Sequence, residues 1–302
     1  MKKLSVVFIL LAGVLWGCIG IFVRHYTALG LSAMQNAFLR LALSAILFAI
    51  FILIYDRNLF RIRLKDLWIF LGSGILSVGV FTICYFRSIE LSSLSVASIL
   101  LYTAPVFVML FSLIFFKEKL TPAKIAALIL AVFGCAMTVG VIGGGLSVSL
   151  PGFFFGLSSG VCYALYSIFS RFALDRGYSP LTVTLYTFIL AAVSVLCVAD
   201  PLPVAKVITA DVGSFFFALL FAVSSCVLPY LFYTLGLKSV RSTTASIIAT
   251  IEPVTATIVG ALFFEEAVQF PFGYLGIALV VGSVVLINLN FKGKKKPGTL
   301  KP

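Results

Sequence analysis

The segment PVFVMLFSLIFFKEKL, residues 105–120, has a counterpart in EPVTATIVGALFFEEAV, residues 252–268. When the chain is shifted against itself by 148 positions, the proline, the Phe-Phe pair and a following glutamate coincide without a gap. Shifts of 147 or 148 also match pairs outside these segments: Tyr85 and Tyr233, Gly134 and Gly282, Arg24 and Arg171, and Gly30 and Gly177. The chain is therefore built from two copies of one unit.

The composition around this repeat is that of a membrane protein. Of the 302 residues, 62% are hydrophobic and only 11% are charged, and the mean hydropathy is +1.19. Soluble domains contain about 25% charged residues, and disordered chains need low hydrophobicity, so both classes are excluded. The net charge of +12 does not indicate a nucleic-acid partner, because the basic residues lie between apolar runs. We expect the lipid bilayer to be the partner.

Ten apolar runs predict the membrane spans. A bilayer core of about 30 Å needs about 20 apolar residues of helix. Runs of about this length, separated by charged or turn residues, cover 4–23, 32–55, 66–86, 92–116, 122–142, 152–170, 179–199, 212–235, 243–264 and 272–290. The sequence predicts an all-α protein with ten transmembrane helices.

The distribution of Lys and Arg predicts the orientation. If the N-terminus is cytoplasmic, 18 basic residues lie on that side and three on the other, while Arg40 lies inside a span. Such a bias places both termini in the cytoplasm and Gly143, Gly144 and Gly145 outside, and the expected location is the plasma membrane, as in a bacterial inner membrane. The first residues are similar to a signal peptide, but their match in the second copy favours a retained span.

The two copies divide the spans equally. We predict a first repeat at residues 1–142, a linker at 143–151, a second repeat at 152–290 and a basic cytoplasmic tail at 291–302. Because each repeat has five spans, the second enters the membrane from the opposite side, which gives an inverted repeat. Inverted repeats are typical of carriers that work by alternating access.

The duplicated pattern of small residues, proline, Phe-Phe and glutamate resembles the EamA family of the drug/metabolite transporter superfamily. The resemblance covers nearly the whole chain. It implies ten helices as two inverted five-helix repeats, with a central cavity lined by helices 1 to 4 and 6 to 9. It also implies export of small metabolites, among them amino acids, sugars, nucleotide sugars and hydrophobic cations. The repeat prolines Pro105 and Pro253 carry over, as do Glu118 and Glu266 as structural helix-end residues.

Polar side chains form a stripe on the fourth span of each repeat. Steps of three and four residues place the members on one helical face, and they include Ser98, Tyr102 and Pro105 in the first copy and Ser246, Thr250 and Pro253 in the second. A hydroxyl stripe gains nothing from lipid, so it should face either the cavity or a neighbouring helix. The prolines free backbone carbonyls at mid-helix and permit a kink, which serves either a cavity or packing alone.

Aromatic residues in the spans provide a second set of cavity candidates: Trp16, Tyr85, Tyr163, Tyr166, Tyr230 and Tyr233. Their rings can stack on planar substrates or hold cations against their π faces. The alternative is that each anchors its helix at the membrane interface.

Two charged residues, Arg40 and Glu252, lie deep in predicted spans. Each should face the protein interior, because a charge at the bilayer centre costs about 2.5–3.5 kcal/mol. Arg40, with Asn36 one turn away, can grip a carboxylate or instead form a structural pair. Glu252 can exchange a proton and couple transport to it, but it also lies among small residues on a face suited to helix packing, and its repeat mate is Ala104.

These observations favour a transporter over an enzyme. Gly156 to Gly160 match a nucleophile-elbow pattern, but they lie in an apolar helix rather than a strand-to-helix turn. The chain lacks the Cys/His spacing of metal sites, so neither catalysis nor a metal or cofactor is expected. A channel or a non-transporting membrane subunit is the remaining alternative. Because Arg40 is the only basic residue inside the spans, we expect small zwitterions, hydrophobic amino acids or organic cations as substrates.

Overall fold

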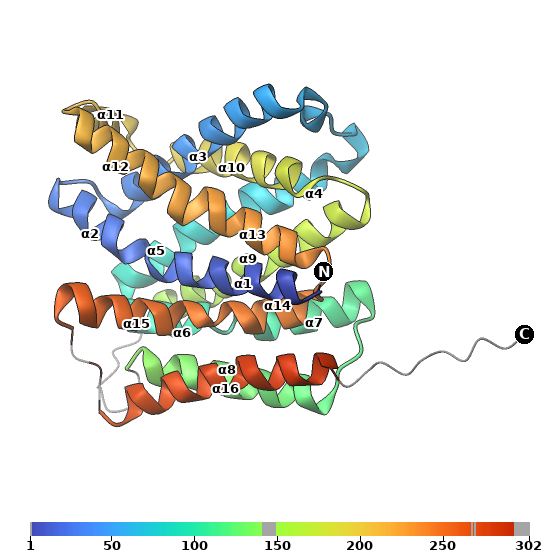
Figure 1. Ribbon diagram of the computed structural model, residues 1–302. Coiled ribbons are helices and arrows are strands. Elements are labelled where there is room, and N and C mark those ends of the chain that lie inside the picture. Colours follow the sequence, from blue (N-terminus) through green and yellow to red (C-terminus); the bar gives the residue numbers. More distant parts are fainter. Residues whose placement is uncertain (1, 141–148, 267, 269, 293–302) are drawn as a thin grey trace, which may run out of the picture.

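The computed structural model describes residues 2–140, 149–266, 268 and 270–292, and every regular element in these ranges is a helix (Figure 1). Most of the predicted linker, including Gly143, Gly144 and Gly145, and nearly all of the basic tail lie outside the described residues. The described end of the linker already belongs to the second half, because the Ser149 hydroxyl accepts a hydrogen bond from the Gly152 amide at 3.1 Å and caps a helix there.

The first half consists of helices separated by short turns. The α-helices are α1 (Lys2–Gly17), α2 (Ile19–Ala28), α3 (Ala33–Tyr55), α4 (Leu67–Leu71), α5 (Phe81–Leu91), α6 (Leu94–Leu101), α7 (Ala104–Phe116) and α8 (Pro122–Thr138). Two short 3-10 helices, η1 (Arg57–Phe60) and η2 (Leu64–Asp66), precede α4, and a π-helical stretch, η3 (Gly72–Val80), joins α4 to α5.

The second half repeats this order. Its elements are α9 (Leu150–Asp175), α10 (Pro180–Leu196), α11 (Pro201–Ile208), α12 (Val212–Ala222), the π-helical η4 (Val223–Val227), α13 (Leu228–Leu237), α14 (Ser242–Ala249), α15 (Ile251–Phe264) and α16 (Phe272–Lys292). The two π-helical stretches, η3 and η4, occupy matching positions of the repeat.

Among the described residues, eight helical stretches are long and apolar enough to cross a bilayer: Lys3–Ala28, Ala33–Tyr55, Leu64–Leu91, Leu94–Phe116, Leu150–Asp175, Val212–Leu237, Ser242–Phe264 and Phe272–Leu289. The other two predicted spans correspond to shorter helices. α8 has 17 residues, and α10 also has 17 and is followed, after a bend of 115°, by α11.

Several helices run further than the apolar runs predicted. Residues 24–26 and 87–90, expected as breaks, are helical, and α11 fills part of the expected break at 200–211. Long side chains such as those of Arg24 and Arg87 can reach water from the end of a span while their backbone groups stay hydrogen-bonded in the helix. Charge therefore marks the membrane boundary here rather than the end of the helix.

The turns that precede α3 and α10 are built alike. Gly30 and Gly177 have positive φ angles of 91° and 85°, which a residue with a Cβ adopts only with strain. Two residues later, Ser32 and Ser179 each cap the following helix with the side-chain hydroxyl. The repeat is thus visible in the backbone as well as in the sequence.

The fourth span of each half is interrupted at equivalent positions. α6 gives way to α7 at Tyr102 and Thr103, and α14 gives way to α15 at Thr250. Pro105 and Pro253 lie within the first three residues of the new helices, where a missing amide hydrogen costs no internal hydrogen bond. At the predicted proline kinks the α-helical pattern is interrupted for one or two residues, while Leu94–Phe116 and Ser242–Phe264 each remain one helical stretch.

Corresponding helices of the two halves pack against each other in opposite directions. A Cβ added at Gly134, near the end of α8, would lie 2.9 Å from the Gly276 carbonyl near the start of α16. For α3 and α10, the Gln35 Nε2 donates to the Asp200 carbonyl at 3.3 Å and the Tyr186 hydroxyl donates to the Phe60 carbonyl at 2.7 Å. α8 and α16 form one edge of the bundle, and the start of α1 lies on the same side as the end of α16 (Figure 1).

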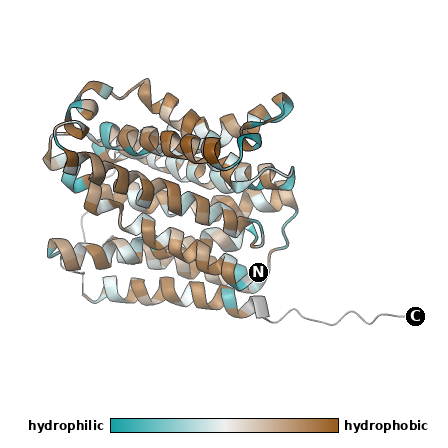
Figure 2. Ribbon diagram, turned by 45° about the horizontal axis from the view of Figure 1, so that its top comes forward, coloured by the Kyte–Doolittle hydropathy of each residue, from teal (hydrophilic) through white to brown (hydrophobic). Residues whose placement is uncertain are grey.

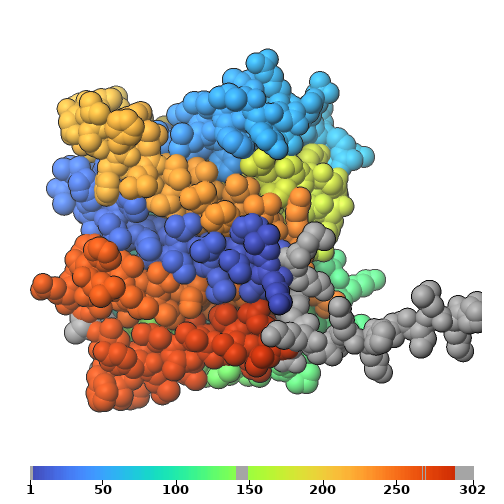
Figure 3. Space-filling view, viewed as in Figure 1, coloured from blue at the N-terminus to red at the C-terminus, as the bar shows by residue number. Residues whose placement is uncertain are grey.

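The outer surface of the bundle is apolar along the helices. Hydrophobic residues cover their lengths, and hydrophilic residues gather toward their ends (Figure 2). The helices lie closely side by side in the space-filling view (Figure 3). Large exposed side chains such as Ile54, Leu262 and Phe263 would be costly in water. This surface fits the hydrocarbon core of a bilayer.

Candidate functional site

A cavity of about 640 Å³ lies between the two halves of the chain. Its walls come from α1, α2, α3, α5, α6, α9, α13 and α15, with the end of α8 near the surface. Ten of the residues predicted from the sequence line it: Trp16, Asn36, Arg40, Tyr85, Ser98, Tyr102, Tyr163, Tyr230, Glu252 and Pro253. Most of these helices belong to the spans expected to surround a central cavity, with two differences: α8, the fifth span, contributes Thr138, and α10, the seventh span, contributes no lining residue.

Aromatic rings form the inner end of the cavity. Trp16, near the end of α1, contacts the rings of Tyr163, Tyr230 and Tyr233 at centroid distances of 6.3, 5.3 and 5.6 Å. Tyr166 contacts Tyr230 edge to face at 4.9 Å. These rings pack between α1, α9 and α13, and they close the cavity toward the end of the bundle where α1 begins.

Hydrogen bonds hold the rings behind this layer in place. The Tyr166 hydroxyl lies 2.7 Å from Thr234 Oγ1, and the Tyr233 hydroxyl lies 2.8 Å from Ser167 Oγ. Both tyrosines are buried, so their hydroxyl groups need these partners. Tyr166 lines neither this cavity nor the smaller one described below. Its role in the structure is to pack and to support Tyr230.

Two opposite charges without an ion-pair partner among the described residues line the cavity from different halves. Arg40 is on α3, and Glu252 is in the first turn of α15, where the helix dipole favours a carboxylate. The Tyr163 hydroxyl donates a hydrogen bond to Glu252 Oε2 at 3.3 Å. Within the described residues, neither charge forms an ion pair and the Arg40 side chain has no hydrogen bond. Each is therefore available to a bound ligand.

Asn36 lies one turn before Arg40 and is 1% exposed. Its Nδ2 group donates to the Leu31 and Ser32 carbonyls at 3.3 and 3.1 Å and to Thr27 Oγ1 at 3.2 Å. Its Oδ1 atom is buried and has no hydrogen-bond partner among the described residues. Asn36 thus fixes the start of α3 and leaves one hydrogen-bond acceptor unused beside Arg40.

Hydroxyl groups line the wall formed by α5 and α6. The Tyr85 hydroxyl lies 3.2 Å from Ser98 Oγ, and Thr82, Ser95 and Tyr102 line the same cavity. Phe81 and Phe86 add an apolar surface on α5. This wall can accommodate a ligand that is partly apolar and partly hydrogen-bonding.

Besides Tyr166, four predicted residues lie outside the main cavity. Pro105, Tyr233, Ser246 and Thr250 line a smaller space of about 20 Å³ that shares Tyr102, Tyr163 and Glu252 with it. The helix breaks at Tyr102 and Thr250 explain the difference, because residues on the two sides of a break no longer share one helical face. The predicted continuous stripe is therefore divided between two spaces.

The same breaks explain the position of Glu252. On a continuous helix it falls on the small-residue face, away from the hydroxyl stripe. In the structure its side chain lines the cavity, while its backbone carbonyl lies against α1: a Cβ added at Gly17 would be 2.7 Å from that oxygen. Glu252 therefore belongs to the cavity and to a close helix contact at once.

The cavity reaches the surface at an ion pair that the sequence did not single out. Arg24, at the end of the first span, pairs with Glu266, just after α15, and its guanidinium lies 4.1 Å from the centre of the Phe264 ring. Both charged side chains are about half exposed, at 50% and 51%. Sequence reasoning assigned Glu266 only a structural role at a helix end. The sequence does contain one indication of the pair, since Arg24 and Glu266 each match a residue of the same type in the other repeat.

The repeat mates of this pair lie apart, toward the other end of the bundle. Arg171 forms an ion pair with Asp175 at 3.0 Å and donates to the Leu237 carbonyl at 3.0 Å. Glu118 instead forms a buried ion pair with Lys124. The bridge between Arg24 and Glu266 therefore has no counterpart between their repeat mates, Arg171 and Glu118.

Comparison with known proteins agrees with this architecture. The sequence profile of the EamA-like transporter family matches residues 3–140 and 150–289. An uncharacterized transporter of Archaeoglobus fulgidus is 26% identical over 290 residues, covering 92% of this chain and 94% of its own. The uncharacterized transporter YyaM of Bacillus subtilis is 24% identical over 303 residues, covering 95% and 92%.

A solved crystal structure also has the same fold. It superposes with a TM-score of 0.79, covers 97% of this chain and 99% of its own, and is 18% identical in sequence. Such a likeness speaks for the fold alone. The family profile, in contrast, matches both halves of the sequence, and on that ground the chain belongs to the EamA-like transporter family.

Proposed function

We propose that the protein is a secondary carrier that exports small zwitterionic metabolites, such as amino acids with apolar side chains. The observation that carries the proposal is the pair of opposite, unpaired charges in one aromatic-walled cavity. Arg40 presents a planar guanidinium that suits a carboxylate, and Glu252 presents a carboxylate that suits an ammonium group. The apolar part of the substrate would lie against Phe81, Phe86 and the ring of Trp16.

Hydrophobic or cationic compounds are the second substrate class that the cavity favours. A cation can be held by Glu252 together with the π faces of Trp16, Tyr163 and Tyr230, without a role for Arg40. The two classes differ in one respect: only a carboxylate-bearing substrate requires Arg40.

We further propose that the chain crosses the membrane ten times, as two inverted repeats of five helices, and works by alternating access. The antiparallel packing of α3 with α10 and of α8 with α16 supports the inverted relation. The cavity opens at the Arg24 end and is blocked by aromatic rings at the other, which supports a carrier over an uncoupled facilitator or channel. A non-transporting subunit has no evident use for such a cavity.

A proton is the coupling ion in this proposal. Glu252 is the one carboxyl group among the cavity residues that lies beside the aromatic layer, and it has a single hydrogen bond, from Tyr163. Protonation of Glu252 would neutralise one side of the substrate site and so link the proton to substrate release. We place both termini in the cytoplasm of a plasma membrane, as the positive-inside rule predicts.

Counterflow in proteoliposomes tests the proposal. The purified protein is reconstituted and loaded with one unlabelled amino acid, and uptake of the labelled compound is measured across a panel that includes apolar amino acids, their amides and their decarboxylated amines. We expect saturable exchange of the zwitterions. Linear flux that does not saturate would show a channel, and absence of exchange throughout the panel would contradict the substrate class.

Arg40 variants separate the two substrate classes. Arg40→Ala should lower the apparent affinity for zwitterions by roughly 10- to 100-fold, the loss expected for a charge-assisted hydrogen bond. Arg40→Lys should restore it only in part, because lysine lacks the planar fork. Arg61→Ala, an exposed arginine outside the cavity, is the matched control. If Arg40→Ala exchanges zwitterions normally, the residue is structural.

A further inference from the structure

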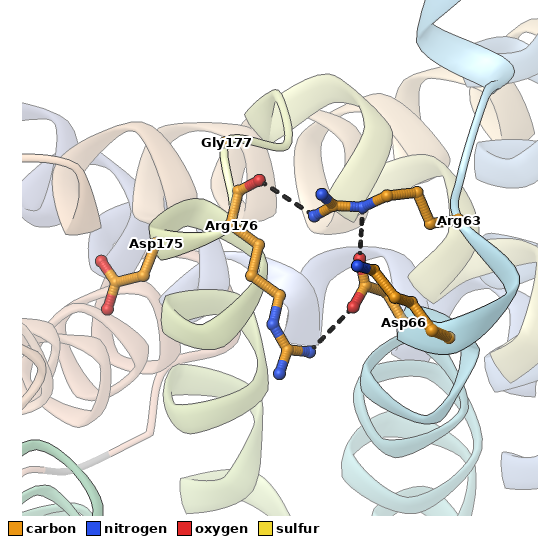
Figure 4. Close-up of a pocket in the computed structure, with 6 residues that line it drawn as sticks. Arg63, Asp66, Asp175, Arg176 and Gly177 are labelled. Carbon is orange, nitrogen blue, oxygen red and sulfur yellow. Dashed lines mark hydrogen bonds and ion pairs between the residues drawn. The ribbon is translucent and has the colours of Figure 1, made fainter.

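A second hollow, of about 620 Å³, lies at the end of the bundle opposite the cavity mouth. It is a wide surface depression between the start of the Leu64–Leu91 span and the end of α9 (Figure 4). Six residues line it: Arg63, Lys65, Asp66, Asp175, Arg176 and Gly177. None of them lines the substrate cavity, so the hollow needs a separate explanation.

The charges in the hollow do not cancel. Asp66 accepts a hydrogen bond from Arg63 Nε at 2.8 Å and pairs with Arg176 Nη1 at 3.1 Å, so one carboxylate serves two guanidinium groups. Asp175 is engaged by Arg171. Lys65 is exposed and has no ion pair or side-chain hydrogen bond in the described part of the chain. Two positive charges therefore remain to face a ligand.

The two guanidinium groups are held in fixed positions. Asp66, with its side chain 3% exposed, also accepts a hydrogen bond from the Tyr178 hydroxyl at 2.8 Å. Arg63 Nη2 donates to the Arg176 carbonyl at 3.3 Å, and Figure 4 shows Arg63 and Arg176 reaching Asp66 from opposite sides. Hydrogen bonds with Tyr178 and Asp66 raise the pKa of Arg63 above its ordinary value and so favour its charged form. Their remaining N–H groups are preorganised donors for an oxyanion.

An apolar surface continues from the hollow along the adjoining span. Leu64 is 85% exposed and Trp68 is 44% exposed, and Leu67 and Leu71 on the same span are exposed as well. Trp68 lies beneath Arg176, whose guanidinium is 5.1 Å from the ring centre. A tryptophan that lies between a cation and exposed leucines is typical of the interface between lipid headgroups and acyl chains. A soluble anion would use only the charged half of this surface.

The cationic cluster is not a requirement of the fold. At the equivalent positions of the repeat, Arg63 corresponds to Asp211, Lys65 to Gly213 and Arg176 to Leu29. Asp211 there caps α12 and accepts hydrogen bonds from the Ser214 amide and hydroxyl at 2.9 and 2.6 Å. The same turn is thus built without these cations at the other end of the molecule. Arg63 and Arg176 also neutralise the buried Asp66, whereas Lys65 supports no described contact and its charge is not explained by folding.

We propose that this hollow binds the phosphate headgroup of an anionic phospholipid, with the acyl chains lying along Leu67, Trp68 and Leu71. Arg63, Arg176 and Lys65 contact the phosphate oxygens and the remaining headgroup charge. Basic depressions between membrane helices are suited to such lipids, and each nearby cation contributes to their attraction. The site does not depend on the proposed substrate.

Tryptophan fluorescence in vesicles tests this proposal. The chain has two tryptophans, and Trp16 is buried in the cavity at 7% exposure, so only Trp68 meets lipid. The full-length protein is reconstituted in phosphatidylcholine vesicles that contain the same mole fraction of dibrominated phosphatidylglycerol or dibrominated phosphatidylcholine. We expect stronger quenching by the brominated phosphatidylglycerol. Trp68→Phe measures the background from Trp16.

Variants decide whether the enrichment is specific. Lys65→Gln removes a charge without breaking a described contact, and it should lower the apparent affinity for phosphatidylglycerol roughly fivefold, the factor expected for one basic residue near an anionic surface. Arg63→Gln with Arg176→Gln should lower it further. Lys119→Gln, an exposed lysine outside the hollow, should change it little.

Three outcomes would overturn the assignment. Equal quenching by the two brominated lipids would mean that no anionic lipid is selected. If Lys119→Gln and Lys65→Gln lower the apparent affinity for phosphatidylglycerol equally, the attraction comes from the overall positive charge of the protein and not from the hollow. Displacement of brominated phosphatidylglycerol by inorganic phosphate, but not by chloride at the same ionic strength, would mean that the hollow is a site for a soluble anion. The Lys65→Gln result stands even if the arginine variants fail to fold.

Discussion

At the scale of single residues, Glu252 combines three structural facts. It lies at the first turn of α15, it accepts a hydrogen bond from Tyr163, and it shares a cavity with the unpaired Arg40. These contacts are the basis of the proposal that Glu252 exchanges a proton during transport.

Glu252→Gln keeps the shape of the side chain but cannot ionise. We expect proton-driven accumulation of substrate to fall at least tenfold, while counterflow, which needs no net proton movement, survives. The measurement is uptake into vesicles with and without a pH gradient. Glu265→Gln, at an exposed position outside the cavity, is the control. If proton-driven accumulation is unchanged in Glu252→Gln, Glu252 has a packing role and no role in coupling.

Residue by residue, the sequence predicted the charged and aromatic members of the cavity better than the hydroxyl members. Arg40, Trp16 and Tyr230 could be found because a charge or a large polar ring inside a span must face protein. Ser246 and Thr250 were placed by counting along a continuous helix, and the break at Thr250 invalidates that count. A single sequence gives no direct signal for such a break, since Pro253 fits both a kink and a helix start.

At the scale of helices, the contact between α1 and α15 passes close to the cavity. Gly13 and Gly17 let the two helices approach, since a Cβ added at Gly17 would lie 2.5 Å from Thr255 Cβ and 2.9 Å from the Ala256 amide nitrogen. Small residues spaced four apart are typical of close helix contacts in membrane proteins.

Gly17→Ala should destabilise the protein by about 1–3 kcal/mol, because the helices must move apart. Gly20→Ala is the matched comparison: its added Cβ meets nothing within 4 Å, so improved helix propensity should leave stability unchanged or raise it by up to about 1 kcal/mol. Thermal unfolding of the detergent-solubilised protein measures both. Equal melting temperatures for the two variants would show that α1 and α15 can move apart without a loss of stability.

The ion pair between Glu118 and Lys124 supports the turn from α7 to α8. Both side chains are nearly buried, at 5% and 9% exposure. Removing one partner, as in Glu118→Gln, should cost about 3–5 kcal/mol because it leaves a buried charge, and adding Lys124→Met should recover most of the loss. Arg87→Gln breaks an exposed pair with Glu90 and should cost less than about 1 kcal/mol. Similar losses for Glu118→Gln and Arg87→Gln in thermal unfolding would contradict this distinction.

Helix positions were more predictable than helix ends. Each of the ten apolar runs contains a helix, because about 20 apolar residues are a strong signal. The sequence did not predict that α9 extends past Arg171 to Asp175, nor did it predict the short α11. Charged residues and prolines were interpreted there as helix breaks. The backbone can stay helical where side chains already reach water.

At the scale of the whole molecule, the described start of α1 and the end of α16 lie on one side of the bundle (Figure 1). The turn between α3 and α4, which contains Arg57, Arg61, Arg63 and Lys65, lies on that side too. The charge count from the sequence assigns this side to the cytoplasm.

Reporter fusions test the orientation. A fluorescent protein fused to the C-terminus should be bright, and alkaline phosphatase at the same position should be inactive. The same phosphatase fused after Ala210, between α11 and α12, should be active because that turn lies at the other end of the bundle. An active C-terminal phosphatase would reverse the assignment of the two sides.

The unequal ion pairs at Glu118 and Glu266 have a consequence for the resting state. These repeat mates have the same place in each half, yet one is buried with Lys124 and the other bridges the cavity mouth to Arg24. In a carrier built from two inverted copies, perfect symmetry would make the two orientations equal in free energy. A shift from 1:99 to 99:1 needs only about 5.5 kcal/mol, which is close to the cost of disrupting one buried ion pair. Substitutions at these glutamates should therefore act on how the population divides between orientations, and so on the thermodynamic bias of the cycle, rather than on the chemistry of recognition.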